Sequence, residues 1–234
     1  MQLPEFSVLE KKLNLNFVDK DIFRQAFTHR SFINENKLVV AEHNERLEFL
    51  GDAVLELATT SFLFKTYPKR QEGELTSFRA ALVNTNTLSE IALKLGFNEY
   101  LLLSKGESKD TGRARQYILA DCLEAVIGAV YIDQGYDAVY TFIETNILPL
   151  TEGIIASGSW IDAKSHFQER AQEAQSVTPI YETTHEEGPD HNKQFTVAVK
   201  ILDEVIASGK GKSKQEAEQQ AAQKALEVKG WMPL

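Results

Sequence analysis

The stretch HNERLEFLGD, residues 43–52, places three carboxylates close together in a segment that otherwise has the pattern of an apolar helix. At about 100° per residue, Glu45, Glu48 and Asp52 fall within a helical stripe only about 60° wide. The apolar positions fall on another side, which should face the core: Leu47, Leu50, Val54 and Leu57. Like charges at these spacings repel each other. Either water or a bound cation must therefore offset the repulsion.

A second acidic pair lies far along the chain, in ILADCLEAVIGAVYID, residues 118–133. Asp121 and Glu124 are three residues apart and share a helix face, and the residues around them are apolar. Carboxylates in such surroundings are seldom buried unless they are paired or bind a metal. Two acidic faces on two apolar helices could meet and form a site for a hard cation such as Mg²⁺ or Mn²⁺. The alternative, two solvated helix faces, stays open at this point.

Composition limits the classes of protein. The chain has 234 residues, 43% of them hydrophobic, which supports an ordinary buried core. A single cysteine, Cys122, excludes an internal disulfide and a cysteine-based zinc site. The N-terminus lacks the apolar run of a secretory signal, and no segment has the length of an uncharged membrane span. These features predict a cytoplasmic protein with no membrane partner.

The net charge of −9 at first argues against nucleic acid as a partner, although lysines cluster locally near the C-terminus. Residues 1–150 show almost continuous helical periodicity, and residues 151–160 have the Gly and Ser content of a flexible linker. After the linker, residues 161–234 predict a helix, three strands and a final helix. The predicted helices of the first part cover 5–14, 19–28, 42–66, 73–95, 115–134 and 136–148.

Four segments together resemble the ribonuclease III family. NERLEFLGDAVL, residues 44–55, is similar to the signature of that family, and residues 118–133 resemble its second acidic segment. FTHRSF, residues 27–32, and EGELTSFRAALVN, residues 72–84, match in the same order. The resemblance extends over nearly the whole chain. It implies a multidomain fold, with an all-α endonuclease domain at 1–150 and a small α+β domain of order αβββα at 161–234.

The resemblance also implies roles for individual residues. Four carboxylates would ligate divalent metal, namely Glu48, Asp52, Asp121 and Glu124. Glu45 and Glu72 match two further acidic positions that line the cleavage groove, so the catalytic set would be Asp52, Glu124, Glu45 and Glu72. Phe49 matches an aromatic side chain that inserts into a partner subunit, which implies a homodimer. On the residue pattern alone, Phe49 could instead pack under a neighbouring loop.

The C-terminal part resembles a double-stranded-RNA-binding domain. Polar residues on one face of its first helix suit the minor groove of A-form RNA, and lysines at the start of its last helix suit a phosphate. The predicted RNA-binding residues are Ser165, Gln168, Glu169, His191, Lys210, Lys212, Ser213 and Lys214. Solvated side chains would give the same pattern. A nucleotide-binding phosphate loop at GKS, residues 211–213, is excluded because Ile206 stands where that loop needs glycine.

The resemblance therefore predicts a dimeric endoribonuclease that cuts duplex RNA with Mg²⁺, or with Mn²⁺ as a substitute. It implies 5′-phosphate and 3′-hydroxyl ends with a short 3′ overhang, and structured precursors such as ribosomal RNA as substrates. Two other classes remain as alternatives. One is a non-catalytic RNA-binding scaffold, which would gain nothing from the acidic stripes. The other is a metal-dependent hydrolase of small nucleotides, which would have no use for the C-terminal domain.

Overall fold

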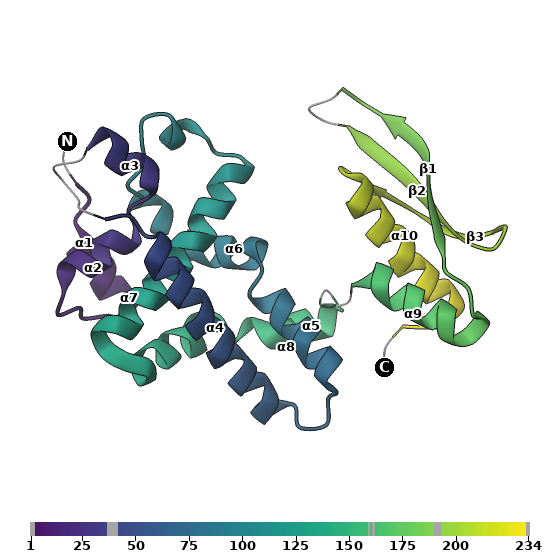
Figure 1. Cartoon of the computed structure of the whole chain (residues 1–234), viewed down its shortest axis with the longest axis horizontal. Helices are drawn as coiled ribbons and strands as arrows, with labels where there is room; N and C mark the ends of the chain where they lie inside the picture. Colours follow the sequence, from purple (N-terminus) through teal and green to yellow (C-terminus); the bar gives the residue numbers. More distant parts are fainter. Residues whose placement is uncertain (1–2, 37–41, 159, 161, 190–192, 233–234) are drawn as a thin grey trace. The chain divides into compact units, whose positions relative to one another are not determined.

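The computed structural model describes residues 3–36, 42–158, 160, 162–189 and 193–232, and the chain divides into two compact units. The first unit extends from residue 1 to residue 160 and the second from 161 to 234. Each unit has its own hydrophobic core. The first is helical and the second combines a three-stranded sheet with two helices (Figure 1), which confirms the predicted fold class.

The described part of the first unit contains helices of very different lengths. They are α1 (Phe6–Leu13), α2 (Lys20–Ala26), α3 (Arg30–Glu35), α4 (Glu45–Thr66), α5 (Glu72–Leu82), α6 (Thr85–Leu95), α7 (Arg113–Asn146) and α8 (Leu150–Ser157), with short 3₁₀ turns η1 (Phe97–Glu99) and η2 (Glu107–Lys109). The long helices α4 and α7 pack along each other at the centre of the unit (Figure 1). This pair forms the scaffold on which the acidic segments lie.

The core face of α4 is rotated from the predicted one. Leu47 and Val54 are buried as expected, and Leu55 is completely buried, but Leu57 is 57% exposed, so its assignment to the core was wrong. The contact face is centred near Gly51 and Ala58 because α7 packs there. Glu48 and Asp52 therefore lie at the edge of the buried face instead of opposite it.

One predicted helix is divided in the structure, and one predicted break is confirmed. The predicted helix 73–95 is split into α5 and α6 because Asn84 begins a new helix, its side chain accepting a hydrogen bond from the backbone N of Thr87 at 3.0 Å. Helix α7 is interrupted at Gly135, where φ is +82°, between the two helices that the sequence predicts. Helix α3 was not predicted, since its six residues are too few to show a period.

The segment 151–160 was predicted to be a flexible linker, but most of it belongs to the first unit as helix α8. Thr151 is buried, and Ile154, Ile155 and Trp160 pack against a small cluster formed by Leu63, Phe78 and Leu82. The ring of Trp160 meets that of Phe78 edge to face, with centroids 4.7 Å apart. Apolar packing thus orders a segment whose glycines and serines are typical of a linker. The first unit thus extends to residue 160 instead of 150.

The second unit has the predicted αβββα order. Its elements are α9 (Ala163–Gln175), β1 (Ile180–Glu187), β2 (Gln194–Ile201), β3 (Glu204–Gly211) and α10 (Lys214–Lys229). The sheet is antiparallel in the order β1-β2-β3, and both helices contribute to a core around Phe167, Val199 and Leu226. Gly209 lets α10 approach β3 closely, since a Cβ there would lie 2.2 Å from the backbone N of Ala221. In the described residues no helix is long and apolar enough to cross a membrane.

Candidate metal centre

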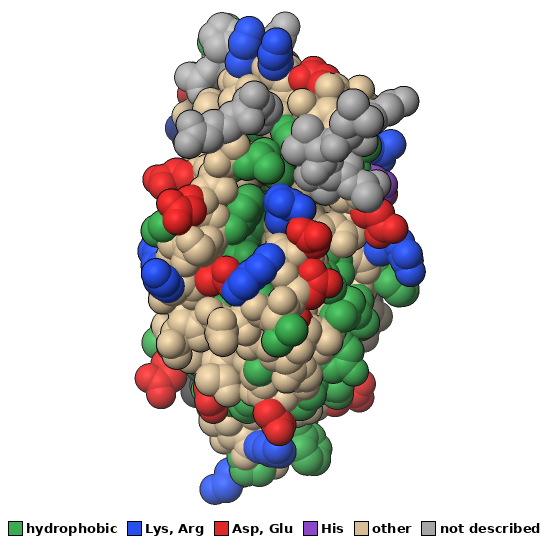
Figure 2. Space-filling model, turned by 90° about the vertical axis from the view of Figure 1, so that its left-hand side faces the viewer, with side chains coloured by type: hydrophobic (Ala, Val, Ile, Leu, Met, Phe, Trp, Pro, Cys, Tyr) green, Lys and Arg blue, Asp and Glu red, His purple; other side chains and the backbone are tan. Residues whose placement is uncertain are grey.

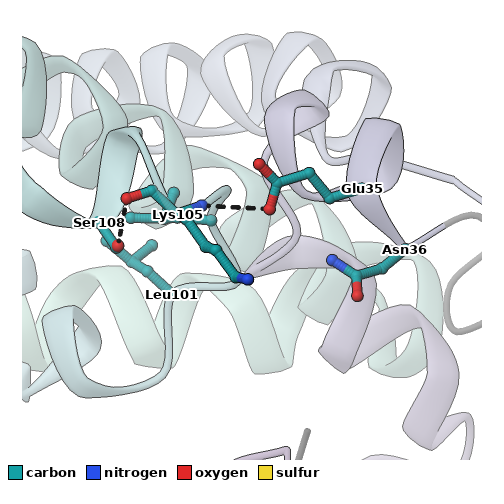
Figure 3. A pocket seen from close by; sticks show the side chains of 6 residues that line it. Glu35, Asn36, Leu101, Lys105 and Ser108 are labelled. Carbon is teal, nitrogen blue, oxygen red and sulfur yellow. Dashed lines mark hydrogen bonds between the residues drawn. The ribbon is translucent and has the colours of Figure 1, made fainter.

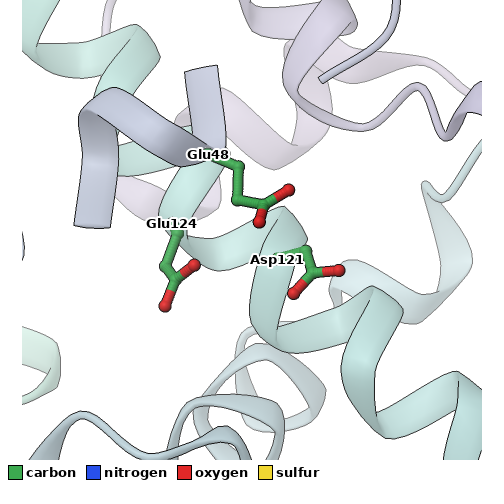
Figure 4. Close-up of side chains that lie close together, drawn as sticks. All are labelled: Glu48, Asp121 and Glu124. Atoms are coloured by element: carbon green, nitrogen blue, oxygen red, sulfur yellow. The ribbon is translucent and has the colours of Figure 1, made fainter. Parts of the chain in front are cut away.

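Three carboxylates from α4 and α7 converge in the first unit. Glu48 extends from α4, and Asp121 and Glu124 extend from α7 toward the same space (Figure 4). One oxygen atom from each carboxylate lies within 4.8 Å of the others, and all three side chains are half-buried. The two acidic segments that the sequence singled out therefore meet at one place. An oxygen-only donor set of this kind suits Mg²⁺ or Mn²⁺.

The electrostatics of this cluster favour a bound cation. Burial, together with the charges of Asp121, Glu45 and Asp52, raises the pKa of Glu48 to about 7. Burial and the charges of Asp52, Asp121 and Glu48 raise the pKa of Glu124 to about 8. Burial also raises the pKa of Asp121. In the described residues no Lys or Arg forms an ion pair with these three carboxylates. A divalent cation would remove this repulsion, so the residues fit the metal.

Asp52 lies next to this cluster but outside the group of converging oxygen atoms. Its side chain is exposed, one helical turn after Glu48. Its charge nevertheless raises the pKa of both Glu48 and Glu124, and its own pKa is raised by burial and by Glu56. Asp52 therefore influences the charge of the cluster, and its role as a ligand remains a prediction.

Glu45 has basic neighbours that the sequence did not reveal. Its carboxylate lies 3.3 Å from the guanidinium of Arg30 and 3.8 Å from Nδ1 of His43. The charge of Glu45 also raises the pKa of Glu48 and Asp121, which places it at the border of the cluster. Arg30 lies in the THRS segment, whose His29 begins helix α3 by accepting a hydrogen bond from the backbone N of Ser31. No spacing in the sequence links Arg30 to Glu45, because the contact is tertiary.

Glu72 is not part of the converging cluster in the described chain. It is the first residue of α5 and lines a pocket of about 440 Å³. Two arginines also line this pocket: Arg79 donates to the Oγ1 of Thr60 at 3.0 Å, and Arg70 pairs with Glu74 at 2.8 Å. A role for Glu72 in cleavage therefore remains a prediction.

A larger pocket of about 590 Å³ lies elsewhere in this unit (Figure 3). Its lining includes Glu35 and Lys105, and the backbone N of Lys105 donates to the Glu35 carboxylate at 3.2 Å. The pocket also borders Asn36, which ends the described stretch 3–36.

On the side of the first unit that carries α1 to α3, acidic and basic side chains are interspersed (Figure 2). The net charge of −9 therefore does not mean that this surface is uniformly acidic.

The predicted RNA-binding residues of the second unit are exposed where the structure describes them. Ser165, Gln168 and Glu169 lie on the exposed side of α9, and Ser165 bonds through both its N and its hydroxyl to Asp162. Lys210, Lys212, Ser213 and Lys214 are exposed around the start of α10, and Ser213 caps that helix. His191 lies outside the described residues.

Comparison with known proteins agrees with both units. Residues 19–151 match the family model described as Ribonuclease-III-like, and residues 163–229 match the double-stranded RNA binding motif. The chain belongs to the ribonuclease III family. It is 46% identical over 222 residues to a "Ribonuclease 3" of Halalkalibacterium halodurans, which covers 94% of this chain and 84% of that relative. A "Ribonuclease 3" of Geobacillus kaustophilus is also 46% identical, over 96% of this chain and 91% of its own length.

Among solved structures, the nuclease domain of a ribonuclease III from Campylobacter jejuni matches with a TM-score of 0.55 and 39% identity. It covers 61% of this chain and 98% of its own length. The present chain, by its family and its relatives, is thus a double-strand-specific endoribonuclease with a C-terminal RNA-binding domain. The family assignment removes the non-catalytic scaffold and the hydrolase of small nucleotides as alternatives.

Proposed function

We propose that this ribonuclease III hydrolyses duplex RNA at a divalent-metal site formed by Glu48, Asp52, Asp121 and Glu124. The observation that carries the proposal is the convergence of the Glu48, Asp121 and Glu124 carboxylates, with one oxygen of each within 4.8 Å of the others. The four acids would hold Mg²⁺, or Mn²⁺ in its place. When bound in a pair, such ions supply an activated water and stabilise the leaving oxygen of a phosphodiester.

The protein's own contribution is position and charge. The rigid pair of helices α4 and α7 holds three of the four acids at fixed separations, so the nucleophile and the scissile phosphate would meet in one orientation. Glu45 lies at the border of the cluster, and its pairing with Arg30 at 3.3 Å orients its carboxylate. The expected products carry 5′-phosphate and 3′-hydroxyl ends with a short 3′ overhang. Structured precursors such as ribosomal RNA are the substrates that we propose.

A homodimer is the state in which we expect cleavage to occur. Phe49 is 81% exposed, and Leu57 and Phe64 on the same helix are 57% and 72% exposed. At about 100° per residue these three lie in one sector of about 80°, which is a large apolar surface for an isolated chain. The similar nuclease domain from Campylobacter jejuni has a region involved in dimer formation, which supports the same state for this chain. With Phe49 in a partner pocket, two metal sites would share one groove, and Glu72 could act there from the other subunit.

The second unit would bind the duplex RNA and so raise its local concentration at the metal site of the first unit. Ser165, Gln168 and Glu169 would contact the minor groove together with His191, while Lys210, Lys212, Ser213 and Lys214 would contact phosphates. The exposed start of α10 supports this division, since free backbone N–H groups and the helix dipole favour an anion there. A cytoplasmic location stays a prediction from the sequence.

One experiment tests the proposal directly. The full chain is incubated with long duplex RNA, single-stranded RNA or a nucleoside triphosphate, each with Mg²⁺ and with EDTA. We expect cleavage of the duplex alone, only with metal, into products that can be ligated through their 5′-phosphates. Cleavage of the duplex in EDTA, or products with 3′-phosphate ends, would contradict the metal site and the proposed chemistry.

A further inference from the structure

One carboxylate in the RNA-binding unit holds two lysines at once. The Oε1 of Glu186 lies 3.0 Å from the Nζ of Lys214, and its Oε2 lies 3.1 Å from the Nζ of Lys193. Lys214 is one of the predicted phosphate-binding residues, and Lys193 directly precedes the first residue of strand β2. Glu186 is at the end of strand β1, so the sheet brings an acid into the middle of a basic surface.

Strand register explains why the three residues meet. Glu186 pairs with Phe195 across β1 and β2, and Phe195 pairs with Gly211 across β2 and β3. Both lysine ammonium groups lie 5.7 Å from the centroid of the Phe195 ring. The end of the β1–β2 hairpin thus lies beside the start of α10 (Figure 1). The aromatic ring forms a common floor, and the carboxylate bridges the two cations above it.

The bridge resembles the way in which two lysines hold a phosphate. Each carboxylate oxygen takes one ammonium group, as two non-bridging oxygens of a phosphodiester would. Hydrogen bonds from Lys214 and Lys193 lower the pKa of Glu186, so it stays an anion at neutral pH. In the described residues Lys210 and Lys212 have no such ion pair. Two of the four lysines near the expected RNA surface therefore already share one carboxylate in the free protein, which cancels one of their two positive charges.

We propose that Glu186 is an internal competitor of the RNA phosphate, which occupies Lys193 and Lys214 in the free protein and lowers the affinity for duplex RNA. The inference rests on the proposed RNA-binding role of the second unit. Duplex binding has to displace the carboxylate from the lysines or leave them unused, and either case costs affinity. Weaker binding of this kind favours release of a cleaved duplex, because the products present the same phosphates as the substrate.

The test measures the affinity of the full chain for duplex RNA, with EDTA present to prevent cleavage. The duplex is longer than about 16 base pairs, the length that such a domain contacts. Glu186→Gln removes the competing charge and keeps the size of the side chain. Glu187→Gln is the matched control, since Glu187 is the next residue on the same strand and its ion pair is with His185 at 3.5 Å. Both variants change the net charge of the chain equally.

We expect Glu186→Gln to bind the duplex roughly fivefold more tightly at low salt, which is the upper range for an exposed ion pair. Glu187→Gln should differ from the parent by about twofold or less, and the advantage of Glu186→Gln should shrink as salt rises. In a chain that already carries Lys193→Gln and Lys214→Gln, adding Glu186→Gln should raise the affinity for duplex RNA no more than adding Glu187→Gln does.

Three results would overturn the role of Glu186. These are equal effects of the two single variants, weaker binding by Glu186→Gln, and an advantage that persists without the two lysines. The first and third would show a general charge effect, and the second would show that the bridge orients the lysines for RNA. A parent chain that fails to bind duplex RNA would contradict the proposed function as well, so the two failures can be told apart.

Discussion

Gly51 on α4 lies directly against Glu124 on α7: a Cβ atom at Gly51 would be 1.8 Å from the backbone O of Glu124. Gly128, one turn further along α7, has the reciprocal contact, since a Cβ there would be 2.2 Å from the backbone O of Leu47. Two helices can approach this closely only where neither has a side chain. The glycine of the HNERLEFLGD stretch thus sets the separation between Glu48 on one helix and Asp121 and Glu124 on the other.

Gly51→Ala should therefore weaken both the fold and the metal site. The methyl group would have to push backbone apart, which typically costs about 1–3 kcal/mol, and the displaced helices would hold the carboxylates at the wrong separation. We expect a lower melting temperature and weaker Mg²⁺ binding by titration. Gly153→Ala is the control, because a Cβ at Gly153 meets nothing within 4 Å. An unchanged Mg²⁺ affinity in Gly51→Ala would contradict the link.

Glu124→Gln tests the metal-ligand role with little change in size. It should bind duplex RNA nearly as the parent does but cleave it more slowly by on the order of 10²-fold or more, since a misplaced nucleophile is costly. Raised Mg²⁺ or Mn²⁺ should restore part of the rate. Glu144→Gln, an exposed site on the same helix, should cleave normally. If Glu124→Gln cut at the parent rate in limiting Mg²⁺, Glu124 would not be a ligand.

The raised pKa values of Glu48, about 7, and Glu124, about 8, predict how stability depends on pH without metal. Their ordinary value is 4.5, so between 4.5 and about 8 the folded chain keeps protons that the unfolded chain has lost. The contribution of these groups to the free energy of unfolding therefore falls as pH rises through this range.

Thermal melts of the parent and Glu124→Gln from pH 5 to 8.5 in EDTA would measure that contribution. The melting temperature of the parent should fall relative to that of Glu124→Gln as pH rises, and Mg²⁺ should stabilise the parent most at the alkaline end, where the ligands are ionised. Parallel curves for the two proteins, or a Mg²⁺ effect that is largest at pH 5, would show that Glu124 does not titrate in this way.

Phe49→Ala should weaken the proposed dimer and leave the helical unit folded. Loss of a buried aromatic contact costs about 2 kcal/mol per copy, and a symmetric dimer has two copies, so the dissociation constant should rise about 10³-fold. Light scattering across a dilution series measures it. Val8→Ala, which removes an exposed apolar side chain on α1, should have no effect. The same molar mass for Phe49→Ala and the parent at every dilution would refute the interface.

Lys212→Ala with Lys214→Ala should weaken duplex binding for every sequence and reduce the log–log salt slope by roughly one per lost phosphate contact. The Nζ of Lys214 is already paired with the Glu186 carboxylate at 3.0 Å. Most of the loss of affinity should therefore come from the change at Lys212. Gln168→Ala should weaken binding with nearly the same slope, since an uncharged side chain releases no counterions. Equal slope changes in both variants would contradict the division into phosphate and minor-groove contacts. Binding at several salt concentrations provides the comparison.

The local sequence pattern was enough to predict most of the helices and strands of this protein and the positions of its acidic residues. Helical period, strand alternation and the spacing of Glu45, Glu48 and Asp52 depend on neighbours a few residues apart, so they can be read along the chain. The same reasoning failed for Leu57 and for residues 151–160. Amphipathic pattern gives only the approximate direction of the core face, and apolar packing onto Phe78 can order a segment that looks like a linker.

Tertiary structure decided which of these residues meet. Glu48 joins Asp121 and Glu124 because Gly51 and Gly128 allow α4 and α7 to touch through their backbones. Arg30 of α3 reaches Glu45 of α4, and strand register together with the start of α10 brings Glu186 between Lys193 and Lys214. The physical reason is the same in each case. Pattern reports the face on which a side chain lies, whereas the partner of that face depends on close packing between segments that are distant in the chain.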